Sequence, residues 1–284
     1  MNMPENPRPR LFVGCAMWSH PTWPAASRER LRTYASWCNA VEGNTTFYAV
    51  PARHTVESWA HQTDPDFRFV PKLPRTITHD RRLSGVDAEL RDFLNAVEPL
   101  GPRLHALWVQ LPSAFGPTDL GSLAAFLRDL PGGYPLAVEV RHRAFFDDPR
   151  AASGLERVLD RVGAEWIPFD TTTLFAREAT SAAEYEARSK KPHLPRRARA
   201  LTDRPIVRYH GCDDSARTIE GWQPWIGTVV DWLREGRSPT VFVHTPDNAG
   251  SRVLARRFHD EIRAHIPELV PLPDPASADP LTLF

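Results

Sequence analysis

The segment Leu136–His142, with the sequence LAVEVRH, carries the two features that predict the fold. It begins with three apolar residues in a row, as expected for a strand that is covered on both faces of a parallel sheet. Glu139 and Arg141 then place opposite charges near its end, two residues apart and so on one side of the strand. Burying an unpaired ion is costly, so these charges call for partners or a ligand. The segment therefore predicts a parallel strand with a polar carboxyl end.

Seven other short apolar runs alternate along the chain with longer segments of helical spacing. These runs are Leu11–Ser19, Ala40–Tyr48, Arg68–Pro74, Leu104–Leu111, Glu165–Asp170, Ile206–Gly211 and Thr240–Thr245. Eight strands alternating with helices predict an α/β fold, and a single closed (β/α)8 barrel of the TIM type fits the pattern best. A doubly wound open sheet is the alternative, although neither GxGxxG nor GxxxxGK[ST] is present to support it.

The helical segments carry apolar residues at intervals of three and four. The stripes comprise Leu90, Phe93, Leu94 and Val97, then Leu155, Val158, Leu159 and Val162, and finally Leu254, Phe258 and Ile262. The length of 284 residues fits one barrel. We expect the barrel over residues 11–268, between a disordered segment at 1–10 and a flexible, proline-rich tail at 269–284.

A long connection between Thr171 and Pro205 has little apolar periodicity and follows the sixth predicted strand. It holds five cations within ten residues: Lys190, Lys191, Arg196, Arg197 and Arg199. We expect a solvated basic loop, and contact with the phosphates of a nucleic acid is the alternative.

Composition narrows the class of protein. The 35 basic and 35 acidic residues balance, so overall charge gives no reason to expect binding to nucleic acid or to a membrane surface. Cys15, Cys38 and Cys212 lack the spacing of a metal site, which favours reduced thiols. The first residues lack the apolar core of a signal peptide, and no run reaches the length of a membrane span. We expect a cytoplasmic protein with no membrane partner.

Ionic and amide side chains lie at the ends of most predicted strands, where barrels place their active sites. They are Glu42, Asn44, Lys72, His79, Gln110, Glu139, Arg141, Asp170, Arg208, His210 and His244. A structural salt bridge between neighbouring strands could explain any one of them. Barrel cores normally use Val, Ile and Leu, so the whole set predicts a functional pocket.

Residue chemistry assigns candidate roles within this pocket. Acid–base candidates are the catalytic set Glu42, Lys72, Glu139 and Asp170. Lys72, Arg141 and Arg208 could hold an anion. The substrate-binding set is Trp18, Asn44, His79, Gln110, Arg141, Arg208, His210, His244 and Asn248, with Trp18 as an aromatic wall. The sequence requires no cofactor. A divalent metal on the carboxylates and histidines is a minority alternative, because the cations would repel it.

Several motifs of this sequence are similar to those of the YecE-like family of unknown function, family seventy-two of that series. The matching blocks are Gly14–Trp23, Val41–Tyr48, Phe67–His79, Gln110–Pro112, Val138–His142 and Val207–Gly211. The resemblance implies a TIM-type barrel and pocket positions at Glu42, Asn44, Lys72, His79, Gln110, Glu139, Arg141, Arg208 and His210. It brings no reaction, since the family's activity is not established.

Two departures from the family pattern stand out. Cys15 and Met17 replace the usual small residues of the first block. His244 stands where the family has an aromatic residue followed by paired asparagines, and Asn248 is the candidate for a surviving amide. These departures leave the roles at that edge of the pocket open.

The last five residues, Pro280-Leu281-Thr282-Leu283-Phe284, resemble the peptide that many bacterial replication and repair proteins present to the sliding clamp. Leu281, Leu283 and Phe284 would fill an apolar groove, and the preceding proline-rich stretch would act as a tether. The alternative is that these side chains fold back onto the barrel.

Three classes of function follow from these features. The first is an enzyme acting on a phosphate-bearing substrate, with nucleic acid among the candidates, such as a hydrolase or a phosphodiesterase- or nuclease-like barrel linked to DNA repair. The second is a sugar isomerase, epimerase or hydrolase. The third is a non-catalytic ligand-binding or adaptor protein.

Overall fold

The computed structural model describes residues 9–23 and 29–275. Within them, strands occur in every run that the sequence predicts. They are β1 (Phe12–Gly14), β2 (Ala40–Gly43), β3 (Arg68–Pro71), β4 (Leu107–Gln110), β5 (Leu136–Glu139), β6 (Glu165–Trp166), β7 (Phe169–Asp170), β8 (Ile206–His210) and β9 (Thr240–His244). Every ladder between them is parallel. The predicted α/β class is therefore confirmed.

The ladders divide into three open sheets rather than one closed sheet of eight strands. Their orders are β1-β9-β8-β7, β2-β3 and β4-β5-β6. Between the sheets, isolated bridges pair Phe69 with Leu104 and Lys72 with Trp108, and the Glu42 N–H donates to the Cys15 carbonyl at 3.1 Å. The predicted sixth strand is split, because Pro168 has no N–H to continue a ladder. Its first half pairs with β5 and its second half with β8.

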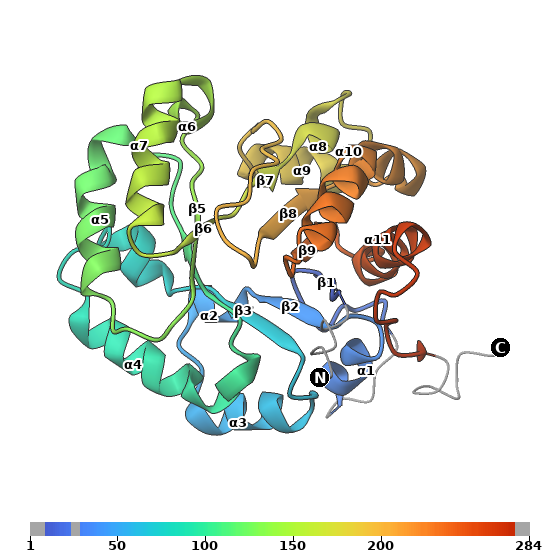
Figure 1. Ribbon diagram of the computed structural model, residues 1–284, viewed down its shortest axis with the longest axis horizontal. Coiled ribbons are helices and arrows are strands. Elements are labelled where there is room, and N and C mark those ends of the chain that lie inside the picture. The colour runs from blue at the N-terminus through green and yellow to red at the C-terminus, as the bar shows by residue number, and fades with distance from the viewer. Residues whose placement is uncertain (1–8, 24–28, 276–284) are drawn as a thin grey trace, which may run out of the picture.

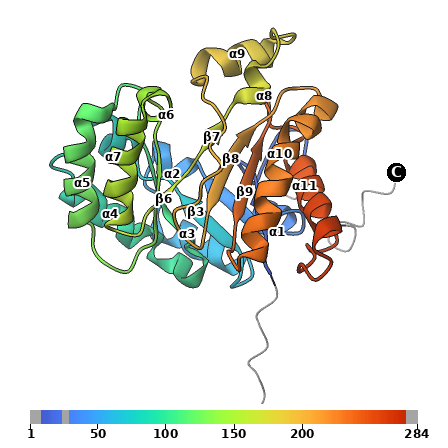
Figure 2. The ribbon, with the colours of Figure 1, turned by 45° about the horizontal axis from the view of Figure 1, so that its top comes forward.

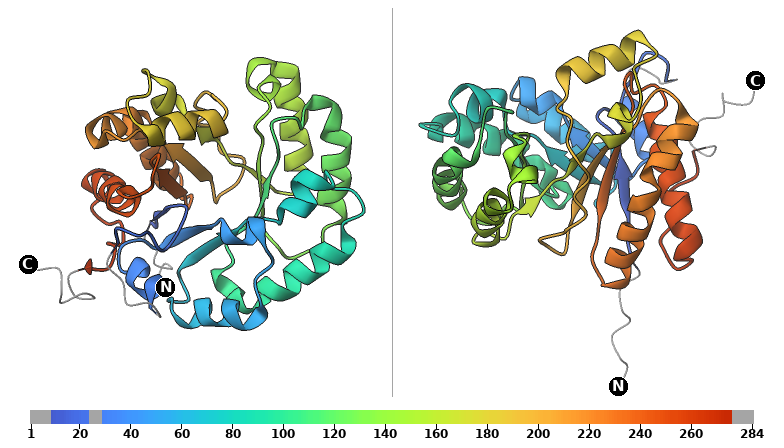
Figure 3. Two further views of the ribbon diagram at one scale, coloured as in Figure 1. Left: turned by 180° about the vertical axis from the view of Figure 1, so that it is seen from behind. Right: turned by 90° about the horizontal axis from the view of Figure 1, so that it is seen from above.

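Helices surround the strands (Figures 1 and 3). They are α1 (Arg30–Ala35), α3 (Arg53–His61), α4 (Asp87–Val97), α5 (Leu120–Asp129), α7 (Pro149–Asp160), α10 (Ser215–Arg234) and α11 (Ser251–His265). Each predicted apolar stripe contributes buried residues, such as Phe93 of α4, Leu155 of α7 and Phe258 of α11. Short turns complete the fold: α2 (Thr45–Tyr48), the π-helix η1 (Thr76–Asp80), the 3-10 helices η2 (Glu98–Arg103) and η3 (Pro117–Asp119), and α6 (Ala144–Asp147).

The connection after β7 is not the irregular loop that the sequence predicts. It contains α8 (Thr172–Phe175) and α9 (Ala182–Lys190), which lie together beyond one end of β7 and β8 (Figure 2). The prediction missed α9 because this helix buries only Glu184 and Ala187, and so shows no apolar stripe. Arg197 and Arg199 are not free either, since both pair with Glu156 of α7.

A second, inner layer of apolar side chains fills the space between the strands on the side away from the helices. It draws on all three sheets and consists of Phe12, Ala40, Val70, Ala106, Trp108, Ala137, Ile167, Ile206 and Phe242. Because side chains alternate along a strand, the next residue on this inner side lies two positions further on. This layer therefore sets the floor on which the next inward-facing residues rest.

The described termini differ in part from the expected boundaries. Leu269 and Leu272, which the sequence places in the tail, are buried in the main core. Arg10 pairs with Asp66 at 2.8 Å. Leu281, Leu283 and Phe284 lie outside the described residues, so the structure gives no account of the clamp-like peptide. None of the helices described is both long enough and apolar enough to cross a membrane.

Candidate functional site

Polar side chains replace the inner apolar layer at the carboxyl ends of the strands. The pairs, each two residues apart on one strand, are Ala40 and Glu42, Val70 and Lys72, Trp108 and Gln110, Ala137 and Glu139, Ile206 and Arg208, and Phe242 and His244. Since residues two apart share a face, all six polar side chains point to the same inner side. The strand period, rather than any local motif, brings them together.

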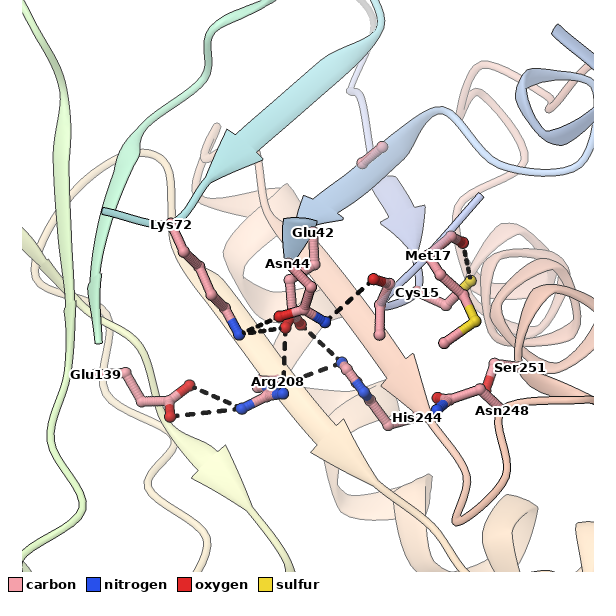
Figure 4. Close-up of polar contacts among 12 residues, drawn as sticks. Cys15, Met17, Glu42, Asn44, Lys72, Glu139, Arg208, His244, Asn248 and Ser251 are labelled. Atoms are coloured by element: carbon pink, nitrogen blue, oxygen red, sulfur yellow. Dashed lines mark hydrogen bonds and ion pairs between the residues drawn. The ribbon is translucent and has the colours of Figure 1, made fainter. Parts of the chain in front are cut away.

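Glu42 lies at the centre of this polar layer (Figure 4). Lys72 Nζ donates to its Oε1 at 2.5 Å, and Arg208 Nη2 lies 3.1 Å from the same oxygen. His244 Nε2 lies 2.7 Å from Oε2. Burial alone would raise the pKa of Glu42, but Arg208, Lys72 and His244 outweigh burial and hold this pKa well below its ordinary value. Glu42 is therefore a carboxylate.

Glu139 is a second buried carboxylate, and Arg208 joins it to the first. Arg141 Nε donates to Glu139 Oε1 at 2.6 Å, and Arg208 Nη1 lies 3.3 Å from Oε2. Burial acts to raise the pKa of Glu139, yet Arg141 and Arg208 bring it below the ordinary value. The Arg208 guanidinium is thus fixed between two carboxylates from different strands.

Two groups around Glu42 hold their protons less tightly than usual. Burial, with Arg208 adding to it, lowers the pKa of Lys72 to about 8. Burial also lowers the pKa of His244 to about 4, although Glu42 attracts its proton. His244 is therefore neutral at pH 7 and donates its Nε2 proton to the carboxylate. His244, which differs from the family pattern, therefore contacts the central carboxylate, Glu42, directly.

A cavity of about 730 Å³ lies over this layer. Its charged lining is entirely cationic within the described residues: Lys72, Arg75, Arg141, Lys190, Lys191 and Arg208. Glu42 and Glu139 have no exposed surface and lie beneath these cations. The neutral lining includes Trp18, Asn44, Phe47, Tyr48, His79, Gln110 and Phe169. The cavity therefore presents positive charge to a ligand and keeps its negative charge below.

Most of the predicted site residues meet here. Trp18, Asn44, Lys72, His79, Gln110, Arg141 and Arg208 line the cavity, while Glu42, Glu139 and His244 contact them from below. His210 is buried one step aside, with its ring 5.9 Å from that of His244, and burial holds its pKa well below the ordinary value.

Asp170 and Asn248, also predicted site residues, bind partners outside the cavity and the polar layer beneath it. Asp170 accepts hydrogen bonds from the backbone and hydroxyl of Thr172 and, at 2.7 Å, from Trp225 Nε1. Asn248 accepts from the Ser251 hydroxyl at 3.3 Å and has a positive φ of 63°. These contacts tie α8 to α10 and shape the turn before α11.

The sequence places Lys191 in a basic stretch that could contact phosphates, but it gives no sign that this residue reaches the pocket at the strand ends. Lys191 follows α9 and reaches the cavity only because the connection after β7 folds over the strand ends. Burial lowers its pKa to about 8, and Arg208 and Arg141 contribute. Arg75, by contrast, lies inside the motif block Phe67–His79 and could have been included. Tyr48 follows the second predicted strand, where an aromatic side chain is expected to form a flat wall.

The π-helix η1 is a second feature that sequence reasoning missed. It places His79 at the cavity, with its ring edge-on to Phe47 at 5.0 Å. Burial lowers the pKa of His79 to about 4, helped by Arg141 and Arg75. Single π turns occur frequently at functional sites.

One residue that lines the cavity has a polar atom without a partner. Gln110 Oε1 is buried and makes no hydrogen bond within the protein. Buried polar atoms are rarely left unpaired, and a ligand can supply the missing partner. Across the described chain, no group of three or more histidines, cysteines or acidic residues is arranged to hold a metal ion.

Comparisons with known proteins place the chain in a family. The family "Protein of unknown function DUF72" matches residues 12–278. The UPF0759 protein YecE of Escherichia coli K12 is 36% identical over 263 residues, covering 93% of this chain and 96% of that protein. The UPF0759 protein YunF of Bacillus subtilis 168 is 26% identical over 225 residues, covering 75% and 72%.

A solved structure shares the fold. The crystal structure of a DUF72 family protein from Enterococcus faecalis V583 superposes with a TM-score of 0.65 at 17% identity, covering 93% of this chain and 99% of that one. The resemblance drawn from the motif blocks is thereby confirmed, and the chain belongs to the DUF72 family, whose function is not known.

Proposed function

We propose that this protein is an enzyme that binds a phosphate-bearing substrate in the cavity at the strand ends. The observation that carries the proposal is the arrangement of charge: six cations line the cavity, and the two carboxylates of the site lie beneath them. Arginine offers a planar fork of donors that suits phosphate oxygens. Arg208 is already fixed by its two carboxylates, so it needs no reordering when an anion arrives.

The charge balance of the site favours a doubly charged ligand. Lys72, Arg141, Lys191 and Arg208 carry four positive charges, against two negative charges on Glu42 and Glu139. Because His244 is neutral, two positive charges remain without a counter-charge. A phosphate monoester carries between one and a half and two negative charges near pH 7. Such a ligand would neutralise the site.

The same residues offer acid–base chemistry. Glu42 and Glu139 are ionised and can accept protons, whereas Lys72 is the group best able both to give and to take one near neutral pH. We keep Glu42, Lys72 and Glu139 as the proposed catalytic set. Asp170 is directed to Thr172 and Trp225, so a role for it would require a rearrangement.

Lys191→Gln tests the binding proposal. This change removes a positive charge from the cavity lining, at an amine whose pKa is lowered by burial and by Arg208 and Arg141. We therefore expect phosphate to bind about tenfold more weakly. The measurement is the rise in melting temperature with inorganic phosphate, at constant ionic strength set with chloride.

The matched control is Arg199→Gln, which removes one charge from the same connection but pairs with Glu156 away from the cavity. It should bind phosphate as the wild type does. Equal losses in the two variants, or a wild type that phosphate stabilises no more than chloride, would refute the proposal.

We further propose that the three sheets are arcs of a single (β/α)8 barrel. Support comes from the inner apolar layer, to which all eight predicted strand positions contribute, and from the backbone contacts that join β2 to the end of β1 and β3 to β4. The cavity would then lie at the end of the barrel where TIM-type enzymes carry their active sites.

The other functions that the sequence suggests remain as alternatives. The aromatic side chains of Trp18, Tyr48 and Phe169 line the cavity and favour binding of a sugar ring. A phosphosugar would provide both this ring and the phosphate. A link to DNA repair through the last five residues remains a prediction, to be checked by clamp pull-down with and without them. Ligand-induced stabilisation without any turnover would instead favour a binding or adaptor protein.

A further inference from the structure

Lysine is rare in this chain, and its placement is not random. The sequence has three lysines, Lys72, Lys190 and Lys191, against thirty-two arginines. All three line the same cavity. Arginine stays protonated in proteins, whereas a buried lysine can release its proton. Cations at all other positions of the chain are arginines, so this cavity is where an amine replaces a guanidinium.

Lys72 is held as a fixed amine on the cavity floor. Its Nζ lies 2.5 Å from Glu42 Oε1 and 2.6 Å from Asn44 Oδ1, and it sits 4.6 Å from the centre of the Trp108 ring. Only 2% of the residue is exposed, yet it contributes to the cavity lining. A rigid, dry amine next to cationic neighbours is the environment in which lysine acts as a nucleophile.

Lys190 provides a contrast within the same cavity. It pairs with Glu186, its side chain is largely exposed, and this pairing raises its pKa. Lys72 and Lys191 instead have pKa values lowered to about 8. The cavity therefore holds an ordinary surface lysine that can serve as an internal reference for reactivity.

We infer that Lys72 forms an imine with a carbonyl group of the substrate, which is then a phosphate-bearing aldehyde or ketone. The inference rests on the proposed function, because Arg141, Arg208 and Lys191 would hold the phosphate group. The deprotonated amine adds to the carbonyl carbon, and Glu42 accepts one amine proton as the carbon–nitrogen bond forms and then returns it to the former carbonyl oxygen. Both amine protons finally leave with the carbonyl oxygen as water, and hydrolysis returns the free amine.

Gln110 supplies a second reason to place a carbonyl here. It lies on β4, the strand next to Lys72 through the bridge to Trp108, and it lines the same cavity. Its buried amide oxygen has no partner in the protein. The hydroxyl of the intermediate that precedes water loss is a donor of the kind this oxygen lacks.

Reductive trapping tests the inference in the full-length protein. Pyridoxal phosphate is added as an anionic aldehyde, sodium borohydride reduces any imine, and peptide mapping by mass spectrometry locates the adduct. We expect Lys72 to be labelled about tenfold faster than Lys190 despite its burial, at a rate that rises with pH towards 8. A merely structural ion pair would make Lys72 the slowest of the three lysines, and that ranking would overturn the inference.

Matched reagents and variants separate this inference from the proposed function. Pyridoxal, which lacks the phosphate, should label Lys72 about tenfold more slowly than pyridoxal phosphate. If the two label it equally, the imine chemistry stands and the phosphate site falls. If phosphate stabilises the protein but Lys72 stays unlabelled, the phosphate site stands and the imine falls.

Lys72→Arg keeps the charge opposite Glu42 but cannot form an imine, so it should lose the adduct and keep the label on Lys190. Arg199→Lys adds an exposed lysine away from the cavity, and this lysine should react no faster than Lys190. Should Lys72→Arg fail to fold, the ranking of the three wild-type lysines still decides the question.

Discussion

Glu42 shows how single residues are used at this site. Side chains from three other strands meet one carboxylate that has no exposed surface. Taking an ion out of water costs several kcal/mol, and a buried pair often does no more than offset that cost. Apolar residues of the same size would hold these strands together as well. The cluster is therefore better explained by ligand binding and chemistry than by fold stability.

Glu42→Gln should destabilise the protein strongly. The change leaves the Lys72 and Arg208 charges buried beside a neutral amide, which typically costs about 3–5 kcal/mol. Urea denaturation measures the loss. The matched control is Glu186→Gln, which also removes a lysine partner but lies at an exposed pair, so its effect should be small. Similar losses of stability in the two variants would mean that removing one partner costs no more in the buried cluster than in an exposed ion pair.

At the scale of elements, the connection after β7 forms one wall of the cavity. The buried Thr171 hydroxyl donates to the Pro192 carbonyl and accepts from the Leu194 N–H, both at 2.9 Å. These bonds hold the segment that directly follows Lys191. Asp170 and Trp225 secure the same region by joining the start of α8 to α10. Residues away from the cavity thus position Lys191, one of the candidates for binding phosphate.

Thr171→Val should loosen this wall without unfolding the protein. The change removes both hydrogen bonds of the Thr171 hydroxyl. Each is worth about 1 kcal/mol net, so loss of the bond from the Leu194 N–H should make that amide exchange with solvent about fivefold faster. Phosphate should also bind more weakly, because Lys191 is less well placed. Hydrogen exchange by mass spectrometry and phosphate thermal shifts check both effects.

The control for this change is Thr228→Val on α10, whose hydroxyl donates to the Pro224 carbonyl within one helix. It should leave the exchange of residues 191–194 unchanged. Unaltered exchange and phosphate binding in Thr171→Val would show that the connection after β7 is held by other contacts.

At the scale of the whole molecule, four buried histidines make stability depend on pH. Burial lowers the pKa of His244 and His259 to about 4, and holds those of His105 and His210 well below the ordinary value. In the unfolded chain these groups titrate near 6.5. As pH falls from about 6.5 towards 4, the unfolded state therefore binds more protons than the folded state, and stability decreases.

The melting temperature should accordingly fall by at least about 5 °C between pH 7 and pH 4.5. The lowered pKa values of Glu42 and Glu139 act in the same direction below about pH 4.5, because those carboxylates must then be protonated. His259→Gln should flatten the decline in unfolding free energy, whereas His54→Gln, on an exposed histidine, should not. A melting temperature that is constant or rises on acidification would contradict the assignment of neutral buried histidines.

Much of the site follows from the sequence by a simple rule. The apolar runs predicted the strands, and their period of two determines that Glu42, Lys72, Gln110, Glu139, Arg208 and His244 share the inner side. The motif blocks predicted the family, which the comparisons confirm. Strand alternation and motif blocks are both patterns of residues close together in the sequence, so the sequence was sufficient for these two predictions.

Only the tertiary structure decided which of these groups meet, and in what state. It turned Asp170 towards Trp225, placed Asn248 in a turn, and brought Lys191, which follows a helix without an apolar stripe, over the strand ends. It also buried the carboxylates under the cations and lowered the pKa of Lys72. Burial and charge pairing arise between residues far apart in the chain, through packing that no local period specifies, and the chemistry of this cavity depends on them.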